Sequence, residues 1–150
     1  MARNKIGLKV KGFEEYMAKL DEIGGTKAMR RGVEEALVES KKYVNPLIEQ
    51  AMTKLPAGGK YSTGGTKESL DKDMSVDWQG GTATIKVGFD FSKSGMKSIY
   101  LMYGTQLHGT PRMPPVAGLK NAIYGAKTTK AIAAIQEDAL NKVIKEIMEE

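Results

Sequence analysis

The residues best suited to chemistry are few, and their spacing matches no known catalytic device. His108 is the only histidine and the chain has no cysteine, so zinc and copper sites lack their usual ligands. Ser and Asp are present, but there is no nucleophile-elbow motif and no paired-carboxylate signature. The sequence therefore predicts no catalytic, cofactor-binding or metal-binding residues, and it predicts that His108 lies in a surface loop.

Two glycine pairs, Gly58-Gly59 and Gly64-Gly65, lie close to Lys60 and Lys67 and invite comparison with a phosphate-binding loop. That loop requires a Lys-Ser/Thr pair at the end of a fixed spacing, between a strand and a helix. The pattern is absent here, so we interpret the segment as a flexible loop.

The aromatic residues offer a different chemistry, because Tyr61, Trp78, Tyr100 and Tyr103 could stack on nucleic-acid bases. They stand among alternating or helically spaced apolar residues, which is more typical of a core or an interface. Four methionines suit adaptable packing at an interface equally with filling of a core. These are Met74, Met96, Met102 and Met113.

Composition indicates one globular domain spanning residues 1–150, made in a cytoplasm and without a membrane partner. Hydrophobic residues make up 41% and charged residues 27% of the chain, close to globular averages. No apolar run approaches the roughly 20 residues that span a bilayer, and the first residues lack the apolar core of a signal peptide. The net charge of +5 permits contact with nucleic acid or an acidic protein, but the scattered Lys and Arg predict a solvated surface of mixed charge.

Hydrophobic periodicity predicts an α+β fold. Alternation of period two predicts strands at 5–10, 73–78 and 82–89, the last two joined as a hairpin through Gln79-Gly80-Gly81. The second hairpin strand should bury one face, namely Ala83, Ile85, Val87 and Phe89. We expect a small, mainly antiparallel sheet packed against a long central helix and a C-terminal helix.

Helical spacing predicts a short helix over 13–23 and a long one capped by Thr26. Pro46 should kink or break the long helix near Asn45. The predicted inner face of that helix is Met29, Val33, Ala36, Leu37, Ser40, Val44, Leu47, Ile48 and Ala51.

A helical turn or two is expected at 119–124, and a last helix at about 128–149, capped by Thr128 or Thr129. The apolar side of the last helix should be Ile132, Ile135, Ala139, Leu140, Val143 and Ile147. Two long loops, at about 53–72 and 90–116, complete the prediction.

The segment from Val87 to Leu119 carries the one local pattern with a distinctive shape. Tyr100 and Tyr103 precede Gly104-Thr105, in a spacing that predicts a short helical or extended piece with an aromatic face. Gly104 and Gly109 can both take positive φ, and Gly104 is expected to need it. The following prolines should make a stiff connector with the residues before them, Thr110 and Met113, extended.

The order of these features resembles the tail-completion, or head-tail joining (neck), proteins of long-tailed bacteriophages, a family typed on the tenth gene product of a lambdoid phage. The likeness begins with an N-terminal strand followed by Gly12-Phe13-Glu14-Glu15 and a short helix. It continues with a long helix, a proline-containing loop with Ser62-Thr63-Gly64 and Lys67-Glu68-Ser69-Leu70, and a strand ending at Val87-Gly88. Last come Tyr100 and Tyr103 with Gly104-Thr105, then Pro111, Pro115 and the small residue Val116. Met102 and Arg112 depart from the family, which commonly has an acidic residue and an aromatic residue there.

The resemblance implies a non-enzymatic structural protein of the virion neck that forms a ring, with six subunits as the expected number. Its implied partners are head connector or stopper proteins, tail terminator or tail tube proteins, and genomic DNA that passes through the lumen without sequence-specific contact. The hypothetical interface residues are Tyr61, Thr63, Gly64, Leu70, Tyr100, Tyr103, Gly104, Thr105, Pro111, Arg112, Met113 and Pro115.

Two other functions stay open from the sequence. One is a basic nucleic-acid-binding protein, motivated by the pI of about 9.3 and the interleaved tyrosines. The other is a small enzyme or toxin that uses His108.

Overall fold

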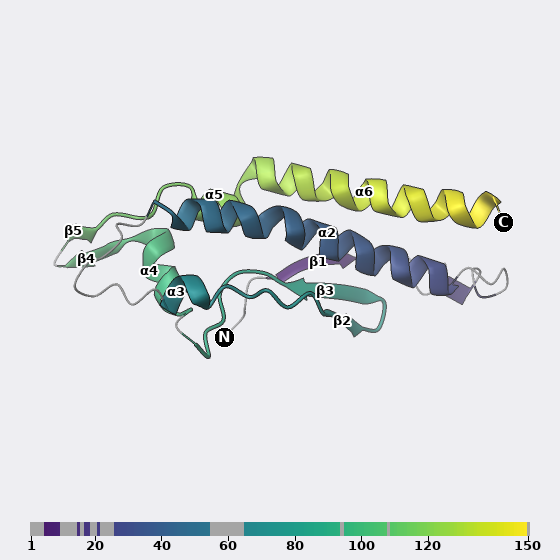
Figure 1. Ribbon diagram of the computed structural model, residues 1–150, viewed down its shortest axis with the longest axis horizontal. Helices are drawn as coiled ribbons and strands as arrows, with labels where there is room; N and C mark the ends of the chain where they lie inside the picture. Colours follow the sequence, from purple (N-terminus) through teal and green to yellow (C-terminus); the bar gives the residue numbers. More distant parts are fainter. Residues whose placement is uncertain are drawn as a thin grey trace.

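Helix α2 (Thr26–Met52) is the middle of three layers in the computed structural model, with a sheet below it and helix α6 (Ala126–Glu149) above it (Figure 1). The structure describes residues 5–9, 15, 17–18, 21, 26–54, 65–93, 95–107 and 109–149. The α+β class predicted from periodicity is confirmed. The C-terminal helix, however, lies on α2 on the side away from the sheet.

The sheet consists of β1 (Lys5–Lys9), β2 (Val76–Gln79) and β3 (Thr82–Lys86), in the order β1-β3-β2 with antiparallel neighbours. Gly80, at φ 58°, turns the predicted β2–β3 hairpin. The predicted face of the second hairpin strand is buried in full: Ala83, Ile85, Val87 and Phe89. The strand predicted from residue 73 begins only at Val76, because Asp73 and Ser75 form local side-chain hydrogen bonds instead of pairing with a strand.

Helix α2 buries the predicted apolar face, except that Leu47 is only half-buried. Residues outside the prediction are also buried: Gly32, Lys41, Asn45 and Met52. We expected a kink or a break near Asn45, and a break is wrong, since α2 runs through Pro46 to Met52. Pro46 has no N–H to donate to the Lys42 carbonyl, and both residues lie on the exposed side of the helix.

The start of α2 also differs from the expectation. Thr26 is the first helical residue and not the N-cap, and its hydroxyl donates to the Asp21 carboxylate. Most of the short helix expected at 13–23 lies outside the described residues, but Glu15, Met17 and Ala18 are helical, and Met17 is buried.

Helix α5 (Leu119–Tyr124) forms where predicted, and α6 begins at Ala126, two residues before the expected start. The hydroxyl of Thr128 donates to the Asn121 carbonyl at 3.0 Å, so this residue ties α6 to α5 and does not cap α6. On the predicted apolar side of α6 only Val143 is fully buried. Ile132, Leu140 and Ile147 are half-buried against the core, together with Ile144.

The two predicted long loops contain regular structure. The first holds α3 (Gly65–Glu68) and an antiparallel bridge between Leu70 and Phe89. The second holds α4 (Lys97–Tyr103) and a hairpin of β4 (Thr105–Leu107) and β5 (Thr110–Met113). These elements are too short for periodicity to reveal them, and tertiary contacts hold them in place.

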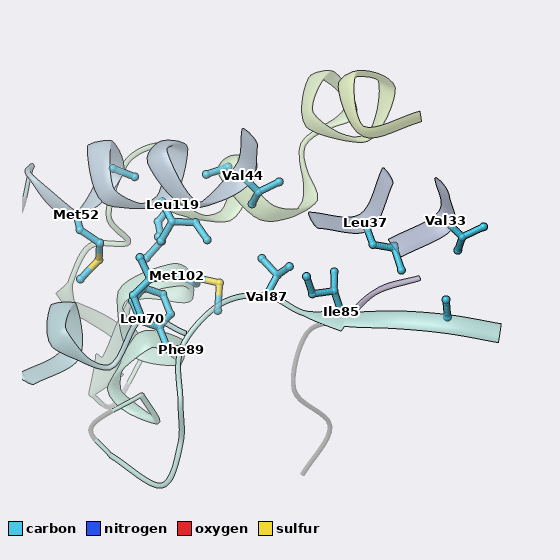
Figure 2. Close-up of a cluster of buried hydrophobic side chains, with 14 of the residues drawn as sticks. Val33, Leu37, Val44, Met52, Leu70, Ile85, Val87, Phe89, Met102 and Leu119 are labelled. Atoms are coloured by element: carbon cyan, nitrogen blue, oxygen red, sulfur yellow. The ribbon is translucent and has the colours of Figure 1, made fainter. Parts of the chain in front are cut away.

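Those tertiary contacts are visible in the core (Figure 2), where Leu70 and Phe89 lie beside Met102 of α4 and Leu119 of α5. All four side chains are at most 7% exposed. Burying side chains of this size contributes about 1.5–3 kcal/mol each. The elements at the end of the molecule opposite the C-terminus (Figure 1) are therefore anchored to the same core as α2 and β3.

Lys41 is a fully buried cation in this core and is the least expected feature of α2. Its ammonium donates to the Asp73 carbonyl and lies 3.5 Å from a carboxylate oxygen of Asp71. One turn further, the Asn45 amide donates to the Asp71 carbonyl at 3.3 Å. Asp73 is in turn held by Ser75, whose hydroxyl and backbone N–H lower the pKa of the Asp73 carboxyl. Together these bonds fasten residues 71–75 to α2.

Replacing Lys41 with Met should lower the free energy of unfolding by about 3 kcal/mol, because it removes the cation beside the Asp71 carboxylate and the donor to the partly buried Asp73 carbonyl. The matched control is Lys42→Met, since Lys42 is exposed and its pair with Glu39 is a surface pair worth at most about 1 kcal/mol. Urea unfolding of both variants provides the measurement. Equal losses in the two variants would contradict the role assigned to Lys41.

Gly32 allows α6 to approach α2 closely. A Cβ atom at this position would lie 3.0 Å from Cβ and 3.3 Å from Cγ1 of Val143, the one fully buried aliphatic residue of α6. Such distances require one of the two helices to shift.

Gly32→Ala should therefore destabilise the protein by about 1–3 kcal/mol through overpacking, although Ala is favoured over Gly in a helix by about 1 kcal/mol. Adding Val143→Ala should restore part of the loss, so that the double variant is more stable than the sum of the single variants predicts. Thermal and urea unfolding of the three variants measure this coupling. A stabilising Gly32→Ala would show that the helices do not meet here.

Candidate interaction surface

Helix α4 presents two different faces. Ser98 and Met102, four residues apart, are buried, whereas Tyr100 and Tyr103 are 52% and 58% exposed. Met96, just before the helix, is 51% exposed. The aromatic face predicted from the spacing of the tyrosines thus exists and lies in solvent.

The turn before α4 explains why the helix starts where it does. The carboxylate of Asp90 accepts the backbone N–H and the hydroxyl of Ser92, while its carbonyl accepts the N–H of Gly95 at 3.0 Å. A Cβ atom on Gly95 would overlap the Asp90 backbone. Only glycine fits this turn, which directs the chain into α4.

Gly104 ends α4 and takes φ 75°, as its place after the tyrosines predicts. Its N–H donates to the Tyr100 carbonyl at 2.8 Å. The chain then enters the β4–β5 hairpin, whose register is irregular between Thr105 and Gln106. Gly109 takes a positive φ of 78°, and Thr110 and Met113 are extended as predicted. After the exposed Pro114 and Pro115, the N–H of Val116 donates to the Leu101 carbonyl at 2.7 Å, which returns the chain to α4.

Helix α5 adds cations and a third tyrosine to this end of the molecule. Lys120 and Tyr124, four residues apart, are both exposed, and the Lys120 ammonium lies 5.1 Å from the ring centroid of Tyr103. Partial burial and the neighbouring Tyr103 raise the pKa of the Tyr124 phenol. We call Tyr103, Lys120 and Tyr124, with Lys54 and Lys127, the α5 surface.

Lys54 and Lys127 reach the α5 surface from α2 and α6. The Lys54 ammonium lies 3.5 Å from the Ala117 carbonyl, just before α5. Both lysines line an open cavity of about 550 Å³ between the end of α2 and the α5–α6 junction, together with Asn121 of α5. On α5, Lys120 lies near Tyr103, and the next residue, Asn121, lines the cavity.

The structure gathers part of the predicted interface and separates the rest. Tyr100, Tyr103, Gly104 and Thr105 lie together at the junction of α4 and β4. Pro111, Arg112 and Met113 lie on β5, where only the backbone is described, and Pro115 is exposed just after it. Leu70 is 6% exposed and belongs to the core, so it is not available to a partner. Tyr61, Thr63, Gly64 and also His108 lie outside the described residues.

We did not predict Lys54, Lys120, Tyr124 or Lys127 from the sequence, although the balance of charges around Lys120 and Lys127 was a signal. Residues 91–136 contain six Lys and Arg and no Asp or Glu. The other 104 residues carry 17 Lys and Arg against 18 Asp and Glu, so the net positive charge of the chain comes entirely from 91–136. The expected even mixture of charges is therefore wrong for this part of the chain.

The α5 surface and the tyrosine face of α4 offer contact groups: aromatic rings, ammonium groups and thioether methyls. Within the described ranges, no three His, Cys, Asp or Glu side chains are placed to hold a metal ion. No helix in the described part of the chain has the length and apolar character needed to cross a bilayer. Comparisons with protein-family models, curated proteins and solved structures find no match to this chain.

Gly104→Val should destabilise the protein by about 1–3 kcal/mol, because a β-branched residue is strained at φ 75°. It should also displace the β4–β5 hairpin relative to α4. The control is Thr105→Val, which places the same side chain at the adjacent extended position in β4. Urea unfolding and the amide NMR shifts of 105–113 report the two effects. A Gly104→Val protein as stable as Thr105→Val would contradict this account of the cap.

Proposed function

We propose that this chain is a structural subunit of the bacteriophage neck, forming a ring that joins the head connector to the tail tube. The observation that carries the proposal is the exposed aromatic face on α4 and α5: Tyr100, Tyr103 and Tyr124, with Met96 beside them. Each of these side chains is 50–58% exposed. Tyr and Met are the residue types that protein interfaces favour.

About half of the surface of each of these rings is exposed to solvent in the isolated chain. An aromatic side chain can bury about 150–250 Å² and contributes strongly to interface energy. The tyrosines lie on elements anchored by Met102 and Leu119 in the core, so a partner would meet a preformed surface. That property suits assembly, because little ordering entropy is lost on contact.

The shape of the subunit also supports a ring. The α4 end and the C-terminal end of α6 lie at opposite ends of the molecule (Figure 1). Contacts between different surfaces of identical subunits are heterologous, and they close into rings when the rotation between neighbours permits it. Ring closure then adds avidity to individually weak contacts.

The resemblance to neck proteins adds the biological setting to this physical case. Its aromatic-Gly-Thr element corresponds to Tyr103, Gly104 and Thr105, which form the end of α4 and the start of β4. In the proposed setting the partners are head connector or stopper proteins and tail terminator or tail tube proteins. The location is the virion, and DNA passes through the ring.

Nucleic-acid binding is the second candidate, and one observation favours it. All of the net positive charge of the chain comes from residues 91–136, so the cations are less scattered than the sequence first indicated. A protein with this function alone would bind nucleic acid without needing to form a ring.

The test of the ring is light scattering after size exclusion, across protein concentration and at low and high salt, with negative-stain imaging of any large species. We expect closed rings for the native chain. Tyr100→Ser with Tyr103→Ser should abolish them while leaving the unfolding free energy within about 0.5 kcal/mol, since both side chains are exposed. The control is Met74→Ser, which removes a 36% exposed apolar side chain just before β2, away from α4 in the sequence. A chain that is monomeric at every concentration, or rings that persist in the double variant, would contradict the proposed assembly surface.

A further inference from the structure

We propose that the lysines of the α5 surface, Lys54, Lys120 and Lys127, bind the phosphate backbone of duplex DNA. The inference rests on the proposed function for the source of the DNA, which there passes through the ring. It adds the surface of the subunit that touches DNA and the chemistry of that contact.

The structure places three lysines around helix α5. Lys54 ends the segment after α2, Lys120 lies on α5 and Lys127 lies in the first turn of α6. Contacts of α5 with α2, α4 and α6 bring these three elements to one place. Three ammonium groups separated by up to 73 positions in the sequence thus surround one short helix.

No carboxylate of the described residues forms an ion pair with these three lysines. The ion pairs of the described residues use Lys41, Lys42, Lys72, Lys86 and Lys142, all outside 91–136. Lys54 is likewise in none of them. Like charges held close together repel, and neutralising phosphates with release of counterions from DNA is favourable.

The sequence around Lys120 and Lys127 lacks carboxylates. Residues 91–136 contain six Lys and Arg and no Asp or Glu. A group of cations without a carboxylate on the same segment suits a polyanion, and contacts to phosphate oxygens carry no sequence information.

The experiment measures binding of the full chain to a fluorescent 30-base-pair DNA duplex of arbitrary sequence by anisotropy, between 50 and 200 mM NaCl (about the range where phosphate contacts are salt-sensitive). We expect Lys120→Gln with Lys127→Gln to weaken binding about tenfold at 100 mM NaCl (roughly mid-range) and to reduce the slope of log K against log salt by about 2. The control, Lys27→Gln with Lys145→Gln, makes the same change in net charge at exposed positions near the start of α2 and the end of α6. It should leave affinity and slope close to the native values.

Three outcomes would overturn the inference. They are affinity independent of salt, equal loss in the control variant, and displacement of the duplex by polyglutamate at the same charge concentration as by unlabelled DNA. The last would indicate an acidic protein as the partner. Light scattering of the same variants separates this inference from the ring: rings that bind no duplex leave the ring standing, whereas a monomer that binds duplex through the α5 surface leaves the DNA contact standing.

Discussion

The structure depends on one constraint, which is that helix α2 must pack on two opposite sides at once. The sheet covers its lower side and α6 its upper side, so its buried residues spread well beyond a single apolar stripe. Gly32 serves the upper contact, because only a residue without a side chain admits Val143. Lys41 and Asn45 serve a third contact, with residues 71–75. Every other layer is placed by reference to this helix.

This constraint explains which parts of the fold the sequence could predict. The central strands and the two long helices have enough residues for their periodicity to be visible, and they form within a few residues of the predicted bounds. The expectation of a break at Pro46 came from the low helix propensity of proline alone. Packing on both sides holds α2 together through Pro46, and the proline lies on the exposed side where a lost hydrogen bond costs least.

The short elements could not be predicted in the same way, because contacts distant in sequence determine them. The bridge between Leu70 and Phe89 and the bond from Val116 to the Leu101 carbonyl place segments that read as loop by composition. For the candidate site, the i, i+3 spacing of Tyr100 and Tyr103 before a glycine was sufficient to predict an aromatic face, and the structure adds that this face is exposed. Lys54 and Tyr124 reach that region only through the packing of α5, which no local pattern reveals.

Residues 91–136 differ from the rest of the chain in their balance of charges, and this difference bears on function. In the three-layer body, even the buried Lys41 has a carboxylate and a carbonyl as partners, and exposed lysines such as Lys86 pair with acids across strands. Residues 91–136 contain no Asp or Glu, and Tyr100, Tyr103 and Tyr124 are each about half exposed. Like charges repel, and the exposed part of each ring gains nothing from folding. Both become favourable when a partner covers the rings or neutralises the ammonium groups. The described ion pairs thus lie in the body and not at the α4–α5 end, which supports placing the proposed contacts at that end.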